Sequence, residues 1–261
     1  MPVLLIAAVA SVAAMSAAWA VVRVRGDGGW VDAVWALSAG LISAGAALWP
    51  DPAAAPERQG LVAALSGLWG LRLAVYLARR TAAAARPDPR YERFKAQWGG
   101  WGLKAWRFLM IQAATLVVLT LSVRAAAVRP EAALDLRDAL AALVVAAAVV
   151  GEAVADRQMA AFRRDPANHG KVADRGLWGW SRHPNYFFEW LVWLAWPVMA
   201  LDPAAPASWL TLPAAAMMWW LLNHVSGVPM LEAEMLRSRP EAYRSYQARV
   251  SRFLPLPPKP R

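Results

Sequence analysis

The sequence of 261 residues contains no cysteine. Disulfide bonds, thiolate metal ligands and a cysteine nucleophile are therefore excluded. Histidine is scarce, since the chain has only His169, His183 and His224, and their spacing fits no metal-binding motif. No G-x-G-x-x-G or Walker loop occurs, and the nearest glycine cluster, at 99–102, lacks the strand context of such loops. We therefore predict no metal site, and we find no common nucleotide-binding loop.

What the chain has in excess is apolar surface. Hydrophobic residues make up 59% of it, which is far more than a soluble domain of this size needs to bury, and this excess indicates an integral membrane protein. The net charge of +10 could in principle serve nucleic acid, anionic lipid or a polyanionic ligand. We assign most of it to the Lys and Arg bias of cytoplasmic loops, and we expect a lipid bilayer and no nucleic acid as partner.

Seven apolar stretches are long enough, or nearly long enough, to cross a bilayer. They cover residues 3–22, 30–49, 60–78, 108–123, 139–155, 186–201 and 207–222. The first is interpreted as a retained span because no lysine or arginine precedes it, although Ala18-Trp19-Ala20 resembles a signal-peptidase site. The last two are short and are separated by a proline-containing turn at 202–206. The prediction is an all-α integral membrane protein, with one transmembrane domain of about seven helices over 1–261.

Lysine and arginine are unequally distributed between alternate connections. One set contains Arg23 and Arg25, the clusters within 79–107 and 157–182, and the cations after Val225. The other set contains only Arg58, Arg124, Arg129 and Arg137. Because cytoplasmic loops carry the excess of cations, we predict that the N-terminus lies outside and that 225–261 forms a cytoplasmic tail. The proline-rich segment 255–260 is expected to be extended.

Ionisable residues inside the predicted spans indicate a possible site, because a charge at the bilayer centre costs about 2.5–3.5 kcal/mol on insertion scales. They are Asp32, Arg72, Glu152, Asp156 and Glu189. In the predicted orientation the four acids and Tyr76 lie toward the cytoplasmic ends of different spans, while Arg72 lies roughly 6 Å deeper. The alternative for each residue is snorkelling to the interface or simple ion pairing. We predict that together they line a cavity open to the cytoplasm.

The segment 176–190 reads Gly-Leu-Trp-Gly-Trp-Ser-Arg-His-Pro-Asn-Tyr-Phe-Phe-Glu-Trp. It resembles the signature of the bacterial branch of the steroid 5-alpha-reductase-like family of membrane enzymes. The R-H-P-N-Y core also occurs in sterol reductases and, more loosely, in isoprenylcysteine methyltransferases. Further similar stretches lie at 67–79, 88–91, 155–163, 226–232 and 243–247. Phe188 departs from the family pattern, because a glycine commonly precedes the glutamate there.

The resemblance implies an NADPH-dependent reductase of a 4-ene-3-oxo steroid or related hydrophobic enone, in a seven-helix bundle without a Rossmann fold. It implies that Tyr76 is the catalytic, carbonyl-facing tyrosine and that Asp32 supports it; Asp32 and Trp35 anchor that part of the match. The positions that it assigns to the NADPH pocket are Arg79, Arg90, Glu152, Asp156, Arg163, Lys171, Ser181, His183, Asn185, Tyr186, Glu189, Glu232 and Tyr246. The tail 225–261 would pack on this pocket, on the cytoplasmic side of a bacterial inner membrane.

This assignment is chemically consistent. Hydride addition to the β-carbon of an enone builds negative charge on the carbonyl oxygen, so a proton donor must be aimed at that oxygen. A tyrosine, with an ordinary pKa near 10, is protonated at neutral pH and can serve. The phosphates of NADPH require cations, which Arg79, Arg90, Arg163 and Lys171 can supply.

Two alternatives stay open at this point. A membrane methyltransferase that uses S-adenosylmethionine would share the R-H-P-N-Y core, but its cofactor is a sulfonium without phosphates, and the dense cationic face favours a polyanion. A non-enzymatic sterol- or lipid-binding membrane protein would use the same cavity without chemistry.

Overall fold

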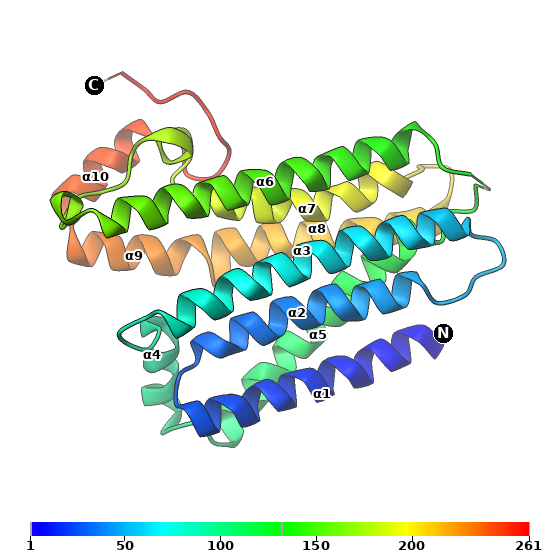
Figure 1. The fold of residues 1–261 in the computed structure, drawn as a ribbon, viewed down its shortest axis with the longest axis horizontal. Coiled ribbons are helices and arrows are strands. Elements are labelled where there is room, and N and C mark those ends of the chain that lie inside the picture. Colours follow the sequence, from blue (N-terminus) through cyan, green and yellow to red (C-terminus); the bar gives the residue numbers. More distant parts are fainter. Residues whose placement is uncertain (1, 132, 261) are drawn as a thin grey trace. The chain divides into compact units, whose positions relative to one another are not determined.

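The structure, a computed structural model, describes residues 2–131 and 133–260 (Figure 1). Within these ranges the chain forms helices and irregular connections and no β-strand. The α-helices are α1 (Pro2–Arg25), α2 (Gly29–Ala47), α3 (Pro56–Ala82), α4 (Pro89–Trp98), α5 (Leu103–Ala127), α6 (Leu136–Arg164), α7 (Pro184–Ala200), α8 (Leu212–Trp220), α9 (Val228–Ser238) and α10 (Pro240–Arg249). Short 3-10 helices cover Pro166–Asn168, Gly176–Gly179 and Pro206–Thr211, and a π-helical turn covers Leu221–Val225. The predicted all-α fold is confirmed.

In the part of the chain that the structure describes, five helices, α1, α2, α3, α5 and α6, are long and apolar enough to cross a membrane. A helix satisfies its backbone N–H and C=O groups internally, and this is the condition for standing in hydrocarbon. The protein is therefore an all-α membrane protein. Helix α7 has 17 residues and α8 has 9, so both the number of seven spans and the orientation stay predictions.

The last apolar stretch, predicted at 207–222, is not one uniform helix. Its beginning is the 3-10 helix Pro206–Thr211, α8 covers Leu212–Trp220, and a π-helical turn continues to Val225. Pro206 and Pro213 each stand in the first turn of a helix, where a missing N–H costs nothing. The tail after Val225 contains α9 and α10, which the sequence analysis did not anticipate, while 255–260 is non-helical as predicted.

The chain divides into two compact units. Unit 1 comprises the described residues up to Ala139 together with Trp196–Ala214, and unit 2 comprises Leu140–Ala195 with the described residues from Ala215 onward. Helices α1 to α5 belong to unit 1, whereas α9, α10 and most of α6 belong to unit 2. The chain passes from one unit to the other within α6, α7 and α8.

Inside unit 1, α2 and α3 are in backbone contact at two glycines. A Cβ atom added to Gly70 would lie 2.5 Å from the Cα of Gly40, and one added to Gly40 would lie 2.8 Å from the Cα of Gly70. Neither position has room for a side chain. In a bilayer, lipid tails are as apolar as leucine, so close packing of small residues is what holds two helices together. The α2–α3 contact follows this rule.

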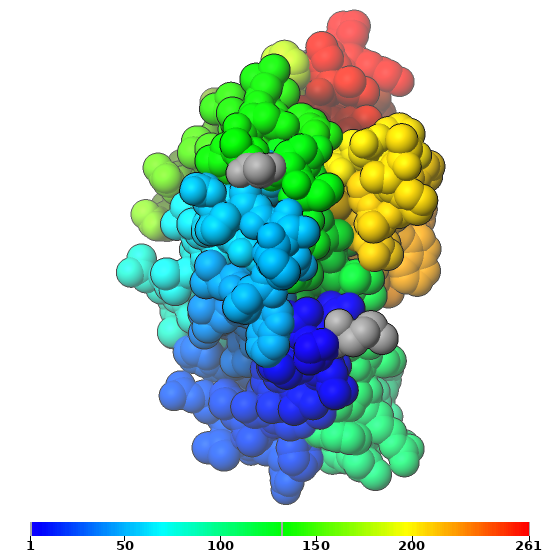
Figure 2. All heavy atoms as spheres, turned by 90° about the vertical axis from the view of Figure 1, so that its right-hand side faces the viewer, coloured from blue at the N-terminus to red at the C-terminus, as the bar shows by residue number. Residues whose placement is uncertain are grey.

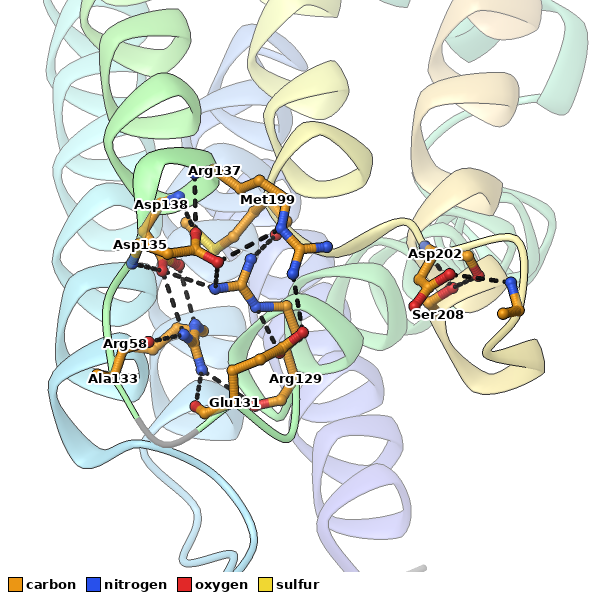
Figure 3. A network of polar contacts seen from close by, with 11 residues as sticks. Arg58, Arg129, Glu131, Ala133, Asp135, Arg137, Asp138, Met199, Asp202 and Ser208 are labelled. Atoms are coloured by element: carbon orange, nitrogen blue, oxygen red, sulfur yellow. Dashed lines mark hydrogen bonds and ion pairs between the residues drawn. The ribbon is translucent and has the colours of Figure 1, made fainter.

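Arg58, near the start of α3, is fully buried and is the centre of a polar network in unit 1 (Figure 3). Its guanidinium binds both oxygens of Asp138, at 2.9 and 3.2 Å. The same group donates to the backbone carbonyls of Arg129 at 3.0 Å, of Glu131 at 2.7 Å, and of Ala133. One side chain of α3 therefore organises the connection between α5 and α6.

Arg129 completes this network from the end of α5. Its guanidinium pairs with Asp138 at 2.8 Å, Asp135 at 3.0 Å and Glu131 at 2.8 Å, and it donates to the carbonyl oxygen of Met199. Asp138 is 1% exposed, so it shares its charge between two buried arginines. A buried charge of this kind is tolerated only when it is paired and fully hydrogen-bonded.

All four cations that the sequence analysis assigned to the outer set of connections are paired with acids. Arg58 and Arg129 are described above, Arg124 pairs with Asp51 at 3.1 Å, and Arg137 pairs with Glu131 at 2.8 Å. These connections lie at the end of unit 1 that carries the start of α1, which we name the N-terminal end. Figure 2 views unit 1 from this end, with the light-blue α2–α3 connection and the dark-blue start of α1 in front.

We predict that Gly70→Ala lowers stability by about 1–3 kcal/mol, since overpacking a closed interface forces the helices apart. Gly67→Ala, one turn earlier on α3, is the matched control, because its Cβ would lie 4.0 Å from the nearest side-chain atom. Its stability should be unchanged or slightly higher, as alanine is the better helix former. Thermal unfolding in detergent measures both; equal midpoints for the two variants would contradict the contact.

We predict that Asp138→Ala destabilises the protein by about 3–5 kcal/mol, because it leaves the buried charge of Arg58 without its carboxylate. Arg137→Gln removes a partly exposed member of the same network and should cost about 1 kcal/mol or less. Denaturant unfolding followed by tryptophan fluorescence compares the two. A loss for Asp138→Ala as small as for Arg137→Gln would show that the backbone carbonyls alone stabilise Arg58.

Candidate functional site

In unit 1 the candidate site is built around Asp32, in the first turn of α2. The hydroxyl of Tyr91 donates to Oδ1 of Asp32 at 2.6 Å, and the guanidinium of Arg90 donates to Oδ2 at 2.7 Å. Both donors come from the first turn of α4, which starts at Pro89 and is capped by the side chain of Asp88. Asp32 therefore attaches α4 to the beginning of α2.

Arg90 is shared between two carboxylates. Its Nη2 lies 2.7 Å from Oδ2 of Asp32 and 2.7 Å from Oδ2 of Asp88. Burial raises the pKa of Asp88, but the hydrogen bonds and positive charge of Arg90 outweigh burial and hold that pKa below its ordinary value. Asp88 is therefore ionised at neutral pH and holds Arg90 in place beside Asp32.

Tyr91 is a functional candidate that the sequence analysis quoted within a motif but did not assign. Its side chain is 5% exposed, and burial, together with the negative charge of Asp32, raises the pKa of its phenol well above 10. The phenol therefore keeps its proton and acts as a donor to Asp32. Its ring fills the space beside Gly28, where an added Cβ would lie 2.3 Å from Tyr91; only this tertiary contact reveals the role.

Tyr76, the predicted catalytic tyrosine, is half-buried on α3. The guanidinium carbon of Arg72 lies 5.5 Å from the centre of its ring, in cation–π geometry. Arg79, three residues further on, is exposed near the end of the same helix. The structure thus joins Asp32 and Arg90 in one cluster, while the predicted support of Tyr76 by Asp32 stays a prediction.

In unit 2 the central group is Glu232 on α9. Oε1 of this carboxylate accepts from Nε of Arg182 at 2.7 Å and from the hydroxyl of Tyr243 at 3.3 Å, and it lies 3.2 Å from Nε2 of His183. Its Oε2 accepts from the amide of Gln247 at 2.9 Å. We name these five residues the Glu232 cluster. It joins α9 and α10 to the Arg-His pair of the R-H-P-N-Y core.

The electrostatics of the Glu232 cluster agree with its geometry. Burial raises the pKa of Glu232, but the hydrogen bonds from His183 and Arg182 and the charge of Arg182 outweigh burial and lower that pKa to about 2. Burial also lowers the pKa of His183, more than the carboxylate raises it. His183 is therefore neutral at neutral pH, and its Nε2–H donates to Glu232.

The extended tail after α10 also binds the segment that contains Arg182 and His183. The hydroxyl of Ser181 donates to the carbonyl of Phe253 at 2.8 Å, and the backbone N–H of Leu256 donates to the carbonyl of Trp180 at 3.0 Å. Tyr246 donates its hydroxyl to the carbonyl of Trp178. Ser181, His183, Glu232 and Tyr246 were predicted in the cofactor pocket; the structure shows them binding one segment of unit 2 to another.

The start of α7 follows this braced segment directly. Asn185 and Tyr186 lie in its first turn, where the ring of His183 stacks on that of Tyr186 with centroids 5.8 Å apart. Glu189, one turn further, is buried and accepts from the indole N–H of Trp193 at 3.3 Å. The first two turns of α7 therefore carry three of the predicted cofactor residues on a rigid element.

Helix α6 contributes the other buried acids of unit 2. Glu152 and Asp156 are buried and four residues apart, so they lie on one face of the helix. Arg163, near the end of α6, and Lys171 beyond it are exposed. Among the described residues, no group of three or more His, Asp or Glu side chains is arranged to hold a metal ion.

Phe188, the departure from the family pattern, packs against α6. A Cβ atom added to Gly151 would lie 2.3 Å from the ring of Phe188. The bulky residue on α7 is thus accommodated by a missing side chain on α6, immediately before Glu152. The compensation lies far away in the sequence, so the motif alone did not show it.

Comparison with known proteins identifies one family. The DUF1295 family, described as "Protein of unknown function", matches residues 18–250, which include every predicted site residue from Asp32 to Tyr246. The chain therefore belongs to the DUF1295 family. No curated protein and no solved structure matches it.

We predict that Glu232→Gln loosens the tail, because Arg182 loses its anionic partner and His183 faces a neutral amide instead of a carboxylate, so that trypsin cleaves within 237–252 faster than in the wild type. Glu234→Gln, which changes an exposed pair with Arg237 on the same helix, is the matched control and should not alter the rate. Equal cleavage of both variants and the wild type would contradict the bracing role.

The lowered pKa of Glu232 also determines how its contribution to the stability of the protein changes with pH. Its folded-state pKa of about 2 lies below the ordinary value of 4.5, so the stabilisation is complete above the ordinary value and is lost as the pH falls through the folded value. The difference in unfolding midpoint between the wild type and Glu232→Gln should therefore shrink between about pH 5 and pH 2. A difference that grows in acid would contradict this assignment.

Proposed function

We propose that the protein is an NADPH-dependent reductase of the carbon–carbon double bond of a 4-ene-3-oxo steroid or a related enone. Family membership supports this proposal, because DUF1295 is commonly associated with steroid 5-alpha-reductase-like proteins. The resemblance of the segment 176–190 to that family points the same way. The proposal includes a location in a bacterial inner membrane with the cofactor side toward the cytoplasm.

The observation that carries the proposal is the bracing of the R-H-P-N-Y segment. The Glu232 cluster and the tail hold this segment at the start of α7, next to Asn185, Tyr186 and the buried Glu189. A binding site needs side chains whose positions are fixed by a supporting layer of hydrogen bonds. A charged residue buried on an apolar helix is costly, so it is rare and often marks a functional site.

The side-chain chemistry fits NADPH. An amide such as Asn185 and a carboxylate such as Glu189 can hydrogen-bond the carboxamide of a nicotinamide. Exposed cations of unit 2, Arg163 and Lys171, can form charge-assisted bonds with phosphates. In this proposal Glu152 and Asp156 hydrogen-bond the polar groups of the cofactor, whereas Ser181, His183, Glu232 and Tyr246 act as positioning residues.

The proposed reaction reduces the enone to a saturated ketone and oxidises NADPH to NADP⁺. NADPH held by these residues would supply a hydride for the β-carbon of the enone, and the α-carbon would take a proton, which gives the saturated ketone and NADP⁺. Tyr76 donates its hydroxyl hydrogen bond to the carbonyl oxygen, where negative charge develops. Asp32 is a positioning residue, which holds α4 through Tyr91 and Arg90.

The test is NADPH oxidation by the purified protein with a panel of 4-ene-3-oxo steroids and simpler enones. We expect oxidation that depends on the added enone, with one equivalent of saturated ketone formed per NADPH. Methyl transfer from S-adenosylmethionine instead would favour the methyltransferase alternative. Steroid binding without either reaction would favour the non-enzymatic alternative.

Tyr76→Phe should lower kcat by about 10²–10³, the usual cost of removing one donor to a developing oxyanion, and should leave NADPH affinity unchanged. Tyr91→Phe is the comparison, because it removes a buried phenol that donates to Asp32. It should lower stability and reduce kcat far less. Turnover by Tyr76→Phe at the wild-type rate would remove Tyr76 from the mechanism.

A further inference from the structure

Among its described residues, unit 1 has cations with an acidic partner and cations without one. At the N-terminal end, Arg58, Arg124, Arg129 and Arg137 are all in ion pairs. The opposite end carries α4, as Figure 1 shows, and there Lys104 and Arg107 on α5 are exposed. Neither forms an ion pair with any residue in the described ranges. The charge of these two residues is therefore available to a partner outside the chain.

Lys104 and Arg107 continue into an apolar stripe on the same face of α5. Residues 104, 107, 111 and 114 follow the three- and four-residue spacing of one helix face. Ile111 is 64% exposed, and Ala114 is also exposed. Another side of α5 faces α1, because the indole of Trp106 donates to the hydroxyl of Ser16 at 3.1 Å. We name residues 104, 107, 111 and 114 the α5 stripe.

The residues of the α5 stripe are spread along the helix over the distance between the headgroup and the acyl chains of a lipid. With a rise of about 1.5 Å per residue, Arg107 lies roughly 6 Å and Lys104 roughly 10 Å from Ile111 along the helix. Since α3 and α5 are both long enough to span, the α4 connection between them lies at a membrane surface. The stripe therefore passes from cations at headgroup level to apolar side chains at acyl level.

Aromatic rings surround this level of α5. Phe108 lies 5.3 Å from Phe94 and 5.2 Å from Trp98, and Trp98 lies 6.3 Å from Trp101, measured between ring centroids. Such rings are enriched at the boundary between headgroups and hydrocarbon. Their presence independently places the α4–α5 junction at the interface.

We propose that the α5 stripe binds an anionic phospholipid. Lys104 and Arg107 hold the phosphodiester through charge-assisted bonds, and an acyl chain lies along Ile111 and Ala114. Cations at a membrane surface attract anionic headgroups, and the apolar continuation of the stripe favours a lipid over a soluble phosphate. The orientation predicted from loop charge would place this lipid in the cytoplasmic leaflet.

The test compares the wild type with Lys104→Gln/Arg107→Gln in nanodiscs that contain zwitterionic lipid with or without phosphatidylglycerol. We expect phosphatidylglycerol to raise the unfolding midpoint of the wild type and to be retained in native mass spectrometry. In the double variant its affinity should be about thirtyfold weaker, since each cation contributes about 1 kcal/mol at such a surface. Arg137→Gln/Arg237→Gln, which removes two paired cations, is the matched control and should retain the effect.

Two outcomes would overturn the proposal. The first is an equal effect of phosphatidylglycerol on the double variant and the wild type. The second is an equal shift with soluble glycerol phosphate, which would mean that the acyl chain plays no part. If the double variant is not recovered, Lys104→Gln alone should lose part of the shift. Stability is measured without NADPH or enone, so the result does not depend on the reductase activity.

Discussion

A fully buried guanidinium must find a partner for every donor, and this requirement at Arg58 shapes one end of unit 1. The group obtains its partners from Asp138 and from backbone carbonyls of the α5–α6 connection, so the connection folds around the charge. Arg129 extends the same requirement to Asp135 and to the carbonyl of Met199. Loops between transmembrane helices have few apolar contacts of their own. In the α5–α6 connection, buried ion pairs and hydrogen bonds fix the conformation that apolar packing fixes in other parts of a protein.

In unit 2, the carboxylate of Glu232 likewise needs hydrogen-bond partners, but as a negative charge it needs donors. It gathers Arg182, His183, Tyr243 and Gln247 around one carboxylate, and so joins two tail helices to the start of α7. Unit 1 uses Asp32 in a similar way to hold α4 through Arg90 and Tyr91. In each case a carboxylate fixes a connection rather than a span. Asn185, Tyr186 and Glu189, which are proposed to bind NADPH, directly follow the connection that Glu232 fixes.

The sequence predicts the features that depend on neighbouring residues in the chain. It does not predict the features that depend on tertiary contacts. Long uncharged runs such as 3–22 and 108–123 can only be helices in a bilayer, and the structure has α1 and α5 there. The last stretch was harder, because Pro206, Pro213 and the π-helical turn at Leu221–Val225 interrupt an apolar run without changing its hydropathy. The partner of Asp32 and the compensation between Phe188 and Gly151 depend on tertiary contacts between distant segments. A single sequence carries no signal for such pairs beyond the residue types themselves.

The tail that fastens the R-H-P-N-Y segment has a consequence for biosynthesis. Ser181 receives its hydrogen-bond partner from Phe253, which is synthesised 72 residues later, and Trp180 likewise waits for Leu256. The segment is therefore synthesised before its final support and acquires that support only after 251–256 have left the ribosome. Quality-control proteases that survey newly inserted proteins would meet an unfinished turn at the start of α7 during this interval.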